Sequence, residues 1–468
     1  MSAAGSEASP ITVRIAGGGV AALEALLTLR SALGDRARVE LIAPDPEFVF
    51  RPLLVAEPFG LTRALRIELE RVAQENGASY RWDAVISVDP TRRRIATAGG
   101  DELDYDALLL AIGTRPVEAV PGALTFGGAE QRAAFAELLG RLGAGGPSRL
   151  VFAAPAEVKW TIAAYELALL TAAHLSDRDV SGVETLVVTH EDEPLGLFGP
   201  SGPRIVNDLL EEQGVRLLTS SAPIRFEAGL LEVADGEPVA ADRVVALPGL
   251  EVPPIAGIPQ RHRGFIPTDV RMSVEGLARV WAAGDATWFP IKQGGLAAQQ
   301  AAVAAGAIAR MAGGTPSDVA YRPTLRAALL TGALPRYLRS EMWDAPKSSE
   351  SSAVSLWWPP GKIAGRHLSS YLARVARGEA VPSSTLSDVD ALPEAETAAA
   401  EAENLEAVHF GLEAAEADAR GGDYAGALEW LETVEELALV LPSPYAERRA
   451  DWTRRARRRV AGAGEMLR

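Results

Sequence analysis

The chain has 468 residues, of which 48% are hydrophobic and 23% charged, as in an ordinary soluble globular protein of two or three domains. Its formal net charge of −16 argues against nucleic acid as a partner, because phosphate binding needs a basic surface. The sequence contains no cysteine, which excludes disulfides, thiolate metal sites and cysteine-held iron–sulfur clusters built from this chain.

No targeting segment is expected. We find no run of about 18 apolar residues, so no transmembrane helix is predicted. The first ten residues, MSAAGSEASP, lack the basic and apolar regions of a signal peptide. A cytoplasmic location is the default expectation. The five histidines show no metal-ligand spacing, and no metal site is predicted.

The N-terminal segment predicts a dinucleotide site. Residues 11–16 read as a strand, 20–33 as a helix and 37–43 as a second strand, which together form a parallel βαβ unit. The connection is a triple glycine. Gly17 permits the tight turn, and Gly19 lets the backbone approach a pyrophosphate. Ala22 is the third small residue, where helix and strand pack closely. The amides and dipole of the helix start favour an anion.

The acidic residue expected after the second strand is displaced. Ala43 stands at the usual distance from the glycine loop, and Asp45 follows two positions later in APDPEF. Two interpretations stay open: Asp45 binds the ribose hydroxyls, or it only starts a turn before Pro46.

Further elements follow in chain order. FVFRPLLVAEPFG, from Phe48 to Gly60, predicts an extended and rigid segment. YDALLLAIGTRP, from Tyr105 to Pro116, predicts a buried strand that ends in a turn. A second unit of alternating strands and helices spans about 148–248. A strand with a Gly-Asp pair just beyond it lies within 277–290, and an Ala-rich helix within 293–313.

The remainder of the chain divides into three parts. Residues 316–376 form a C-terminal portion, and residues 377–396 a polar linker with prolines and serines. Residues 397–468 predict a helical, tetratricopeptide-like tail, whose last helix is rich in arginine. This tail is a candidate surface for homo-oligomer formation, for a protein partner or for peripheral membrane contact, although pairing with the acidic helices before it is the plainer interpretation.

Four segments in order, GGGVAALEA, AIGTRP, VWAAGDATWFP and KQGGLAAQQA, resemble the FAD-dependent pyridine nucleotide–disulfide oxidoreductase superfamily. FVFRPLL and PIKQGG are most similar to the branch of sulfide:quinone oxidoreductases and type II NADH dehydrogenases. The resemblance implies an α/β fold of two nested Rossmann-like dinucleotide-binding domains, glutathione-reductase-like, with the helical tail added. The FAD domain is then discontinuous, 10–115 and 255–315, with the second Rossmann-like domain inserted at 116–254.

The same resemblance implies FAD as the cofactor and suggests which residues hold it. Gly17, Gly19 and Ala22 match the pyrophosphate loop, and Gly113 and Thr114 the turn beside the adenosine half. Arg51 and Pro52 match the segment beside the isoalloxazine, and Asp285 the acid at the ribityl chain or its phosphate. Gln293 and Gly294 match the helix start that faces the flavin pyrimidine ring. Lys292, just before them, either steers an anionic substrate, stabilises the reduced flavin or is a surface lysine.

Two departures from that family limit the activity. The second domain should carry a glycine loop for NAD(P)H, but residues 153–166 read AAPAEVKWTIAAYE. Pro155 and Trp160 stand where a pyrophosphate needs bare backbone. The sulfide:quinone branch also works through a cysteine relay, for which this sequence has no residue. Sulfide oxidation by that mechanism is therefore excluded.

The sequence thus predicts an FAD-dependent oxidoreductase that takes electrons from a non-nicotinamide donor and passes them to a quinone or another small molecule. Trp160, Tyr165, Trp357 and Trp358 are candidates for an aromatic substrate pocket, with buried packing as the alternative. No catalytic residue is assigned. Two other functions stay open: an NAD(P)H dehydrogenase with an irregular nucleotide loop, and a non-enzymatic flavin-binding protein whose tail recruits a partner.

Overall fold

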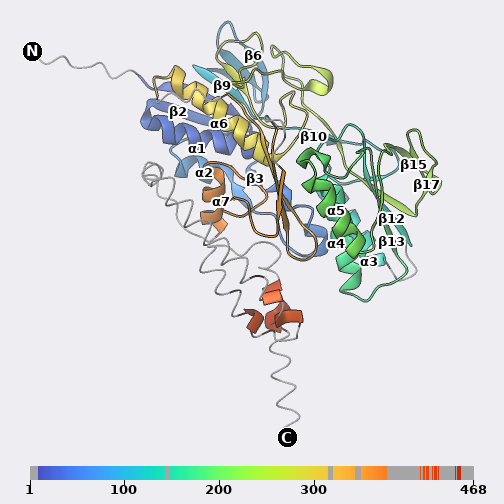
Figure 1. Cartoon of the computed structure of the whole chain (residues 1–468). Helices are drawn as coiled ribbons and strands as arrows, with labels where there is room; N and C mark the ends of the chain where they lie inside the picture. The colour runs from blue at the N-terminus through green and yellow to red at the C-terminus, as the bar shows by residue number, and fades with distance from the viewer. Residues whose placement is uncertain are drawn as a thin grey trace, which may run out of the picture.

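Two parallel sheets organise the molecule (Figure 1). The structure is a computed structural model that describes residues 9–142, 148–314, 320–342, 349–357 and 359–376, and in the tail 412, 415–416, 418–420, 424, 426–428, 431, 448–449 and 451–454. Within these ranges, every helix is too short or too polar to cross a lipid bilayer.

The first sheet has the strand order β20-β9-β1-β2-β5, and every neighbouring pair is parallel. Its strands are β1 (Ile11–Ala16), β2 (Ala37–Ala43), β5 (Ser79–Trp82), β9 (Ala107–Leu110) and β20 (Val280–Ala282). Helices α1 (Val20–Leu33) and α6 (Gly294–Met311) pack together on one face, as Figure 1 shows. Because α1 and α6 consist largely of Ala and Leu, they have high helix propensity and bury most of their surface.

The second sheet has the order β11-β18-β12-β13-β14 and is also parallel throughout. Its strands are β11 (Leu124–Thr125), β12 (Arg149–Ala154), β13 (Glu184–Thr189), β14 (Arg216–Leu218) and β18 (Arg243–Ala246). Three helices lie on the same side of it in Figure 1: α3 (Ala129–Arg141), α4 (Ile162–Ser176) and α5 (Ser201–Glu212). A smaller sheet covers its other face: β15 (Pro223–Glu227), β16 (Leu230–Val233) and β17 (Val239–Ala240).

Shorter elements connect these layers. The remaining strands of the two halves are β3 (Glu47–Val49), β4 (Arg66–Glu68), β6 (Val85–Asp89), β7 (Arg94–Thr97), β8 (Glu102–Asp104), β10 (Arg115–Val117) and β19 (Gly249–Glu251). Helix α2 (Leu69–Glu75) and five 3₁₀ turns complete them: η1 (Gly34–Arg36), η2 (Arg51–Leu53), η3 (Glu57–Phe59), η4 (Gly196–Phe198) and η5 (His262–Gly264). Strands β10 and β19 pair antiparallel where the chain passes between the two sheets.

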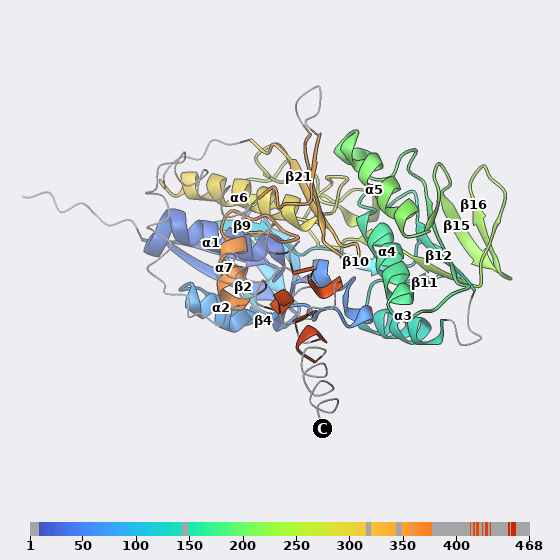
Figure 2. The same cartoon turned by 60° about the horizontal axis from the view of Figure 1, so that its bottom comes forward.

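The C-terminal portion lies between the two halves (Figure 2). It consists of the antiparallel strands β21 (Thr324–Leu329), β22 (Arg336–Glu341) and β23 (Ser349–Ser352), followed by helix α7 (Leu368–Ala376). The buried carboxylate of Glu24 in α1 accepts hydrogen bonds from the amides of His367 and Leu368, at 3.1 and 2.9 Å. It therefore fixes the start of α7 to the first domain.

The described part of the tail packs on the C-terminal portion. A small apolar cluster consists of Leu412, Ala415, Ala427, Leu431 and Trp452. Leu334, in the turn between β21 and β22, packs against it, and Arg448 donates to the carbonyl of Gly332. The predicted linker at 377–396 lies outside the described residues.

The predicted α/β fold class is confirmed, with one local correction. The segment Phe48–Gly60 is not extended throughout, because only Phe48 and Val49 belong to a strand. The rest turns through η2 and η3, which have Pro52 and Pro58 in their first turns. Proline is favoured there because its fixed φ suits a helix start. The domain boundaries given above remain predictions.

Candidate functional site: a dinucleotide cradle at the edge of the first sheet

Four predicted residues lie just beyond the carboxyl ends of neighbouring strands. Gly17 follows β1, Asp45 follows β2, Gly113 follows β9 and Asp285 follows β20. Because these strands are parallel, their ends meet at one edge of the sheet. In open α/β sheets this edge is where ligands bind.

Gly17 forms the tight turn from β1 into α1. Its φ is +127°, and its amide donates to the carbonyl of Ile42 at 2.8 Å. A Cβ at this position would lie 2.1 Å from the carbonyl oxygen of Ala111. Gly17 is therefore required by the fold itself, since neither the dihedral nor the space admits a side chain.

Gly19 has a different role. It is the N-cap of α1, has an extended backbone (φ −90°) and makes no side-chain cap. No protein atom lies within 4 Å of the Cβ that another residue would add. Three residues on, the buried Ala22 packs into the core. The space beside Gly19 at the start of α1 is thus open, which fits the close approach of the pyrophosphate of FAD to this helix end.

Asp285 offers an acceptor that the protein leaves unused. Among the described residues its carboxylate has no hydrogen bond or ion pair. Burial raises the pKa of Asp285, while the charges of Lys292 and Arg51 oppose that rise. The turn before it is rigid, because Gly284 donates to the side chain of Gln300 in α6 at 2.8 Å. A carboxylate held in this way fits a hydroxyl-bearing ligand such as the ribityl chain.

Lys292 lies inside the protein rather than free on its surface. Its Nζ donates to the carbonyls of Thr287 and Phe289, at 2.5 and 2.6 Å, and stands 3.9 Å from the centre of the Phe265 ring. Burial lowers the pKa of Lys292 to about 8, although the nearby Asp285 acts in the opposite direction. The lysine therefore brings positive charge close to the acid, but its hydrogen bonds secure the loop before α6.

Gln293 begins α6 and ties it to the C-terminal sheet. Its Oε1 accepts from the amide of Leu296 at 2.7 Å, which caps the helix, and its Nε2 donates to the carbonyl of Arg326 in β21 at 2.9 Å. A Cβ on Gly294 would stand 2.7 Å from Ile363. The side chain of Gln293 is thus used by the fold, and its backbone and the helix dipole remain available to a flavin ring.

The other cofactor candidates are placed around this edge. Asp45 is exposed, and its carbonyl accepts from the hydroxyl of Tyr80 at 2.9 Å. Arg51 and Pro52 form the first residues of η2, and Arg51 is exposed. Gly113 has a φ of +65° with no atom near its missing Cβ, and Thr114 follows it.

The corresponding loop of the second sheet carries side chains where the first has glycines. Pro155, which follows β12, is buried. Glu157 accepts from the guanidinium of Arg263 at 3.1 Å, beside the backbone of Gly249. The ring of Trp160 packs on Phe198, with centroids 5.9 Å apart. A proline, a carboxylate and an indole therefore lie in this turn, as the sequence predicted, in place of the glycines typical of a pyrophosphate loop.

Three of the four aromatic candidates lie among the described residues, and they make contacts with different partners. Tyr165 is fully buried, and its hydroxyl donates to Glu191 at 2.6 Å. Trp357 packs edge-on against Tyr337 at 5.3 Å and donates to the carbonyl of Gly361. Buried packing, the alternative interpretation, describes Tyr165 and Trp357. Trp160 is partly exposed, and Trp358 lies outside the described residues.

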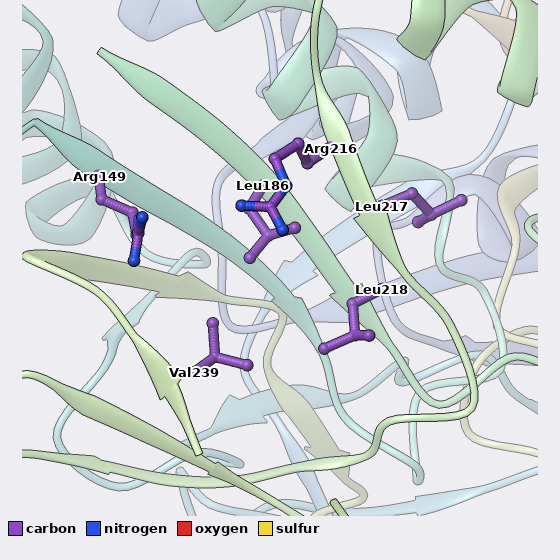
Figure 3. A pocket seen from close by; sticks show the side chains of 6 residues that line it. All are labelled: Arg149, Leu186, Arg216, Leu217, Leu218 and Val239. Atoms are coloured by element: carbon purple, nitrogen blue, oxygen red, sulfur yellow. The ribbon is translucent and has the colours of Figure 1, made fainter. Parts of the chain in front are cut away.

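A hollow in the second sheet lies elsewhere. Its volume is about 170 Å³, and Figure 3 shows its lining residues, Arg149, Leu186, Arg216, Leu217, Leu218 and Val239. Arg149 and Arg216 are the first residues of β12 and β14, and both pair with Glu184. Since the arginines stand at the amino ends of the strands, this hollow is separate from the ligand-binding edge.

Sequence reasoning missed the pair that joins the second domain to the C-terminal portion. The Nζ of Lys362 lies 2.6 and 2.7 Å from the two oxygens of Glu166 in α4, and one of these oxygens also accepts from the amide of Leu330. Burial raises the pKa of Glu166, against the effect of Lys362. The only signal was a charged residue within an apolar helix.

Comparison with known proteins agrees with this arrangement. The sequence matches the family described as pyridine nucleotide-disulphide oxidoreductase over residues 11–150 and 162–306, more than half of the chain. The chain belongs to this family. FAD is therefore its cofactor, and the residues around the first sheet fit it.

Two of the similar proteins are sulfide–quinone reductases, and one is a ferredoxin reductase. It is 25% identical to the sulfide-quinone reductase of Aquifex aeolicus over 220 residues, which are 45% of this chain and 51% of that protein. The chain thus matches about half the length of this curated relative. The solved structure of the sulfide:quinone oxidoreductase from Aquifex aeolicus has a TM-score of 0.68 at 21% identity, covering 80% of this chain and 93% of that one. The ferredoxin reductase for the CYP199A2 system of Rhodopseudomonas palustris has a TM-score of 0.56 at 18% identity, covering 81% and 98%.

Proposed function

We propose that this protein is an FAD-dependent oxidoreductase that accepts electrons from a non-nicotinamide donor and passes them to a quinone or another small-molecule acceptor. The turn after β12, which has no glycine, is the observation that carries this proposal. Pro155, Glu157 and Trp160 lie in the turn where a second dinucleotide would need bare backbone, which supports a donor other than NAD(P)H. The similarity to sulfide-quinone reductases supports a quinone as acceptor.

The donor differs from sulfide handled through a cysteine relay, because these 468 residues contain no cysteine. FAD, when bound, supplies two-electron chemistry at its ring. The chain's own residues bind and orient it: α1 holds the pyrophosphate, Asp285 accepts from a hydroxyl, and the start of α6 presents a positive dipole end to the ring. Lys292 adds positive charge near the start of α6, and this charge favours negatively charged groups there.

Anaerobic mixing tests the donor side. The FAD-loaded protein is mixed with NADH or NADPH, and the visible flavin absorbance is followed. We expect no rapid bleaching. Rapid bleaching by either nucleotide contradicts the proposal and supports the alternative of a dehydrogenase with an irregular loop. The matched variant Glu157→Gln removes the carboxylate from the turn, and comparison of its nucleotide affinity with that of the wild type isolates the contribution of this charge.

Reoxidation tests the acceptor side. The flavin is reduced by light and then mixed with a water-soluble quinone or with oxygen. The proposal requires quinone to reoxidise the protein-bound flavin faster than it reoxidises free FAD. Equal rates would contradict an enzymatic role and favour a non-enzymatic flavin-binding protein.

A further inference from the structure

The C-terminal sheet has one apolar face, and its other face carries a row of charged residues. Alternate residues of β21 and β22, such as Leu325, Leu329 and Leu338, belong to the core shared with α4 and α5. The opposite face carries a row across all three strands, in which Arg326 stands opposite Arg339, and Arg339 opposite Glu350. Figure 2 shows β21 at the centre of the molecule.

Two guanidinium groups directly opposite each other on a sheet repel. Arg339 has partial compensation, because it donates to Glu341 at 3.1 Å and lies 4.0 Å from Glu350. Its Nε is nevertheless buried and has no hydrogen-bond partner in the part of the chain that the structure describes. The side chain of Arg326 has no hydrogen bond or ion pair to any residue in the described ranges. This face therefore holds guanidinium donors that make no hydrogen bond to the residues the structure describes.

The surroundings of Arg326 make this arrangement costly without a ligand. Burial lowers the pKa of Arg326, and the charge of Arg339 lowers it further, with Glu341 acting in the opposite direction. A partly buried cation without an acceptor destabilises the fold. An anion placed between the two arginines would offset their repulsion and would accept the hydrogen bonds that they lack.

The flanking residues indicate which anion. Glu341 and Glu350 stand on either side of Arg339 and cancel part of the positive charge, so a second negative charge on the ligand gains little. A planar carboxylate matches the two parallel donors of a guanidinium. The next row of the same face is apolar, with Ala328 and Tyr337 against Trp357.

We propose that Arg326, with Arg339 behind it, binds the carboxylate of a small organic acid on this face of the C-terminal sheet. The site is built by the protein alone and does not depend on the flavin reaction. The strand that carries Arg326 is nevertheless fixed to the start of α6 through Gln293, which places the site next to the flavin-facing helix.

Calorimetric titration of the full-length, FAD-loaded protein tests this site. Sodium benzoate is the probe, benzamide its neutral counterpart and inorganic phosphate the doubly charged comparison, all at constant ionic strength in chloride. We expect saturable binding of one benzoate per chain, weaker binding of phosphate and none of benzamide. Absence of saturable benzoate binding, or equal binding of benzamide, overturns the proposal.

Three variants assign the binding to these residues. Arg326→Gln should weaken benzoate binding about tenfold or more, as expected when a charge-assisted pair is lost. Glu350→Gln should tighten it, because a repelling carboxylate is removed from a half-exposed position. Arg322→Gln, at the exposed arginine just before β21, should leave it unchanged. Equal effects of Arg326→Gln and Arg322→Gln, or weaker binding by Glu350→Gln, contradict the site. The Glu350→Gln variant keeps the test decisive even if Arg326→Gln does not fold.

Discussion

Alanine substitutions at the two outer glycines of the N-terminal loop should have different effects, one on the stability of the fold and the other on FAD affinity. In Gly17→Ala, the new Cβ lies 2.1 Å from the carbonyl oxygen of Ala111, at a φ of +127°. A residue forced into such a conformation costs about 1–3 kcal/mol, and overpacking of a tight contact costs about 1–3 kcal/mol more. We expect a loss of about 2–6 kcal/mol in the free energy of unfolding of the FAD-free protein.

Gly19→Ala is the matched control. Its backbone is extended and its Cβ meets no protein atom, so the unfolding free energy of the FAD-free protein should change by about 1 kcal/mol or less. The added methyl group instead occupies the space in front of α1, and FAD affinity should fall. Gly17→Ala therefore tests the fold, and Gly19→Ala tests the ligand.

Urea unfolding of the FAD-free proteins and titration with FAD separate these effects. A Gly17→Ala variant as stable as the wild type refutes the close contact with Ala111. Normal FAD affinity in Gly19→Ala refutes the placement of the pyrophosphate at the start of α1.

Four further outcomes follow from the same structure. Asp285→Asn should keep the fold but weaken FAD binding about tenfold to a hundredfold in an FAD titration, since a charged acceptor is lost; unchanged affinity contradicts its role. The lowered pKa of Lys292 means that the unfolded chain binds the lysine proton more tightly than the folded chain does. The unfolding free energy of the FAD-free protein should therefore rise with pH between about pH 8 and the ordinary lysine pKa of about 10.4, relative to that of Lys292→Met. Parallel pH profiles of the two proteins contradict this prediction. Lys362→Met should lower the free energy of unfolding in urea by about 3–5 kcal/mol, because it leaves Glu166 unpaired. The double variant with Glu166→Gln should lose less stability than Lys362→Met alone. Additive losses of the two single variants contradict a coupled pair. Truncation after Arg374 should leave FAD binding intact, and colourless protein would contradict the placement of the tail outside the cofactor domain.

Much of the fold was predictable because its signals are local. The buried strands and the Ala-rich helices have periodicities and propensities that depend only on neighbouring residues. Gly17, Gly19 and Asp285 could be identified since each belongs to a short motif with fixed spacing after a strand. The error at Phe48–Gly60 is also local, because prolines suit both an extended segment and the first turn of a 3₁₀ helix.

The candidate substrate residues could not be judged in the same way. Tyr165 and Trp357 are aromatic residues near the expected site, but whether a ring lines a pocket or fills the core depends on distant partners. Lys292 is a similar case, because its two carbonyl partners and the ring of Phe265 come together only through folding.

By itself, the sequence determined the presence of the dinucleotide motif, its order relative to the second sheet and the absence of a cysteine relay. Only the tertiary structure decided which charges meet. Glu166 with Lys362, and Arg326 opposite Arg339, are separated in the chain and are joined by domain docking and strand register. The physical reason is that backbone propensity acts between near neighbours, whereas burial and electrostatic pairing depend on the packed three-dimensional arrangement.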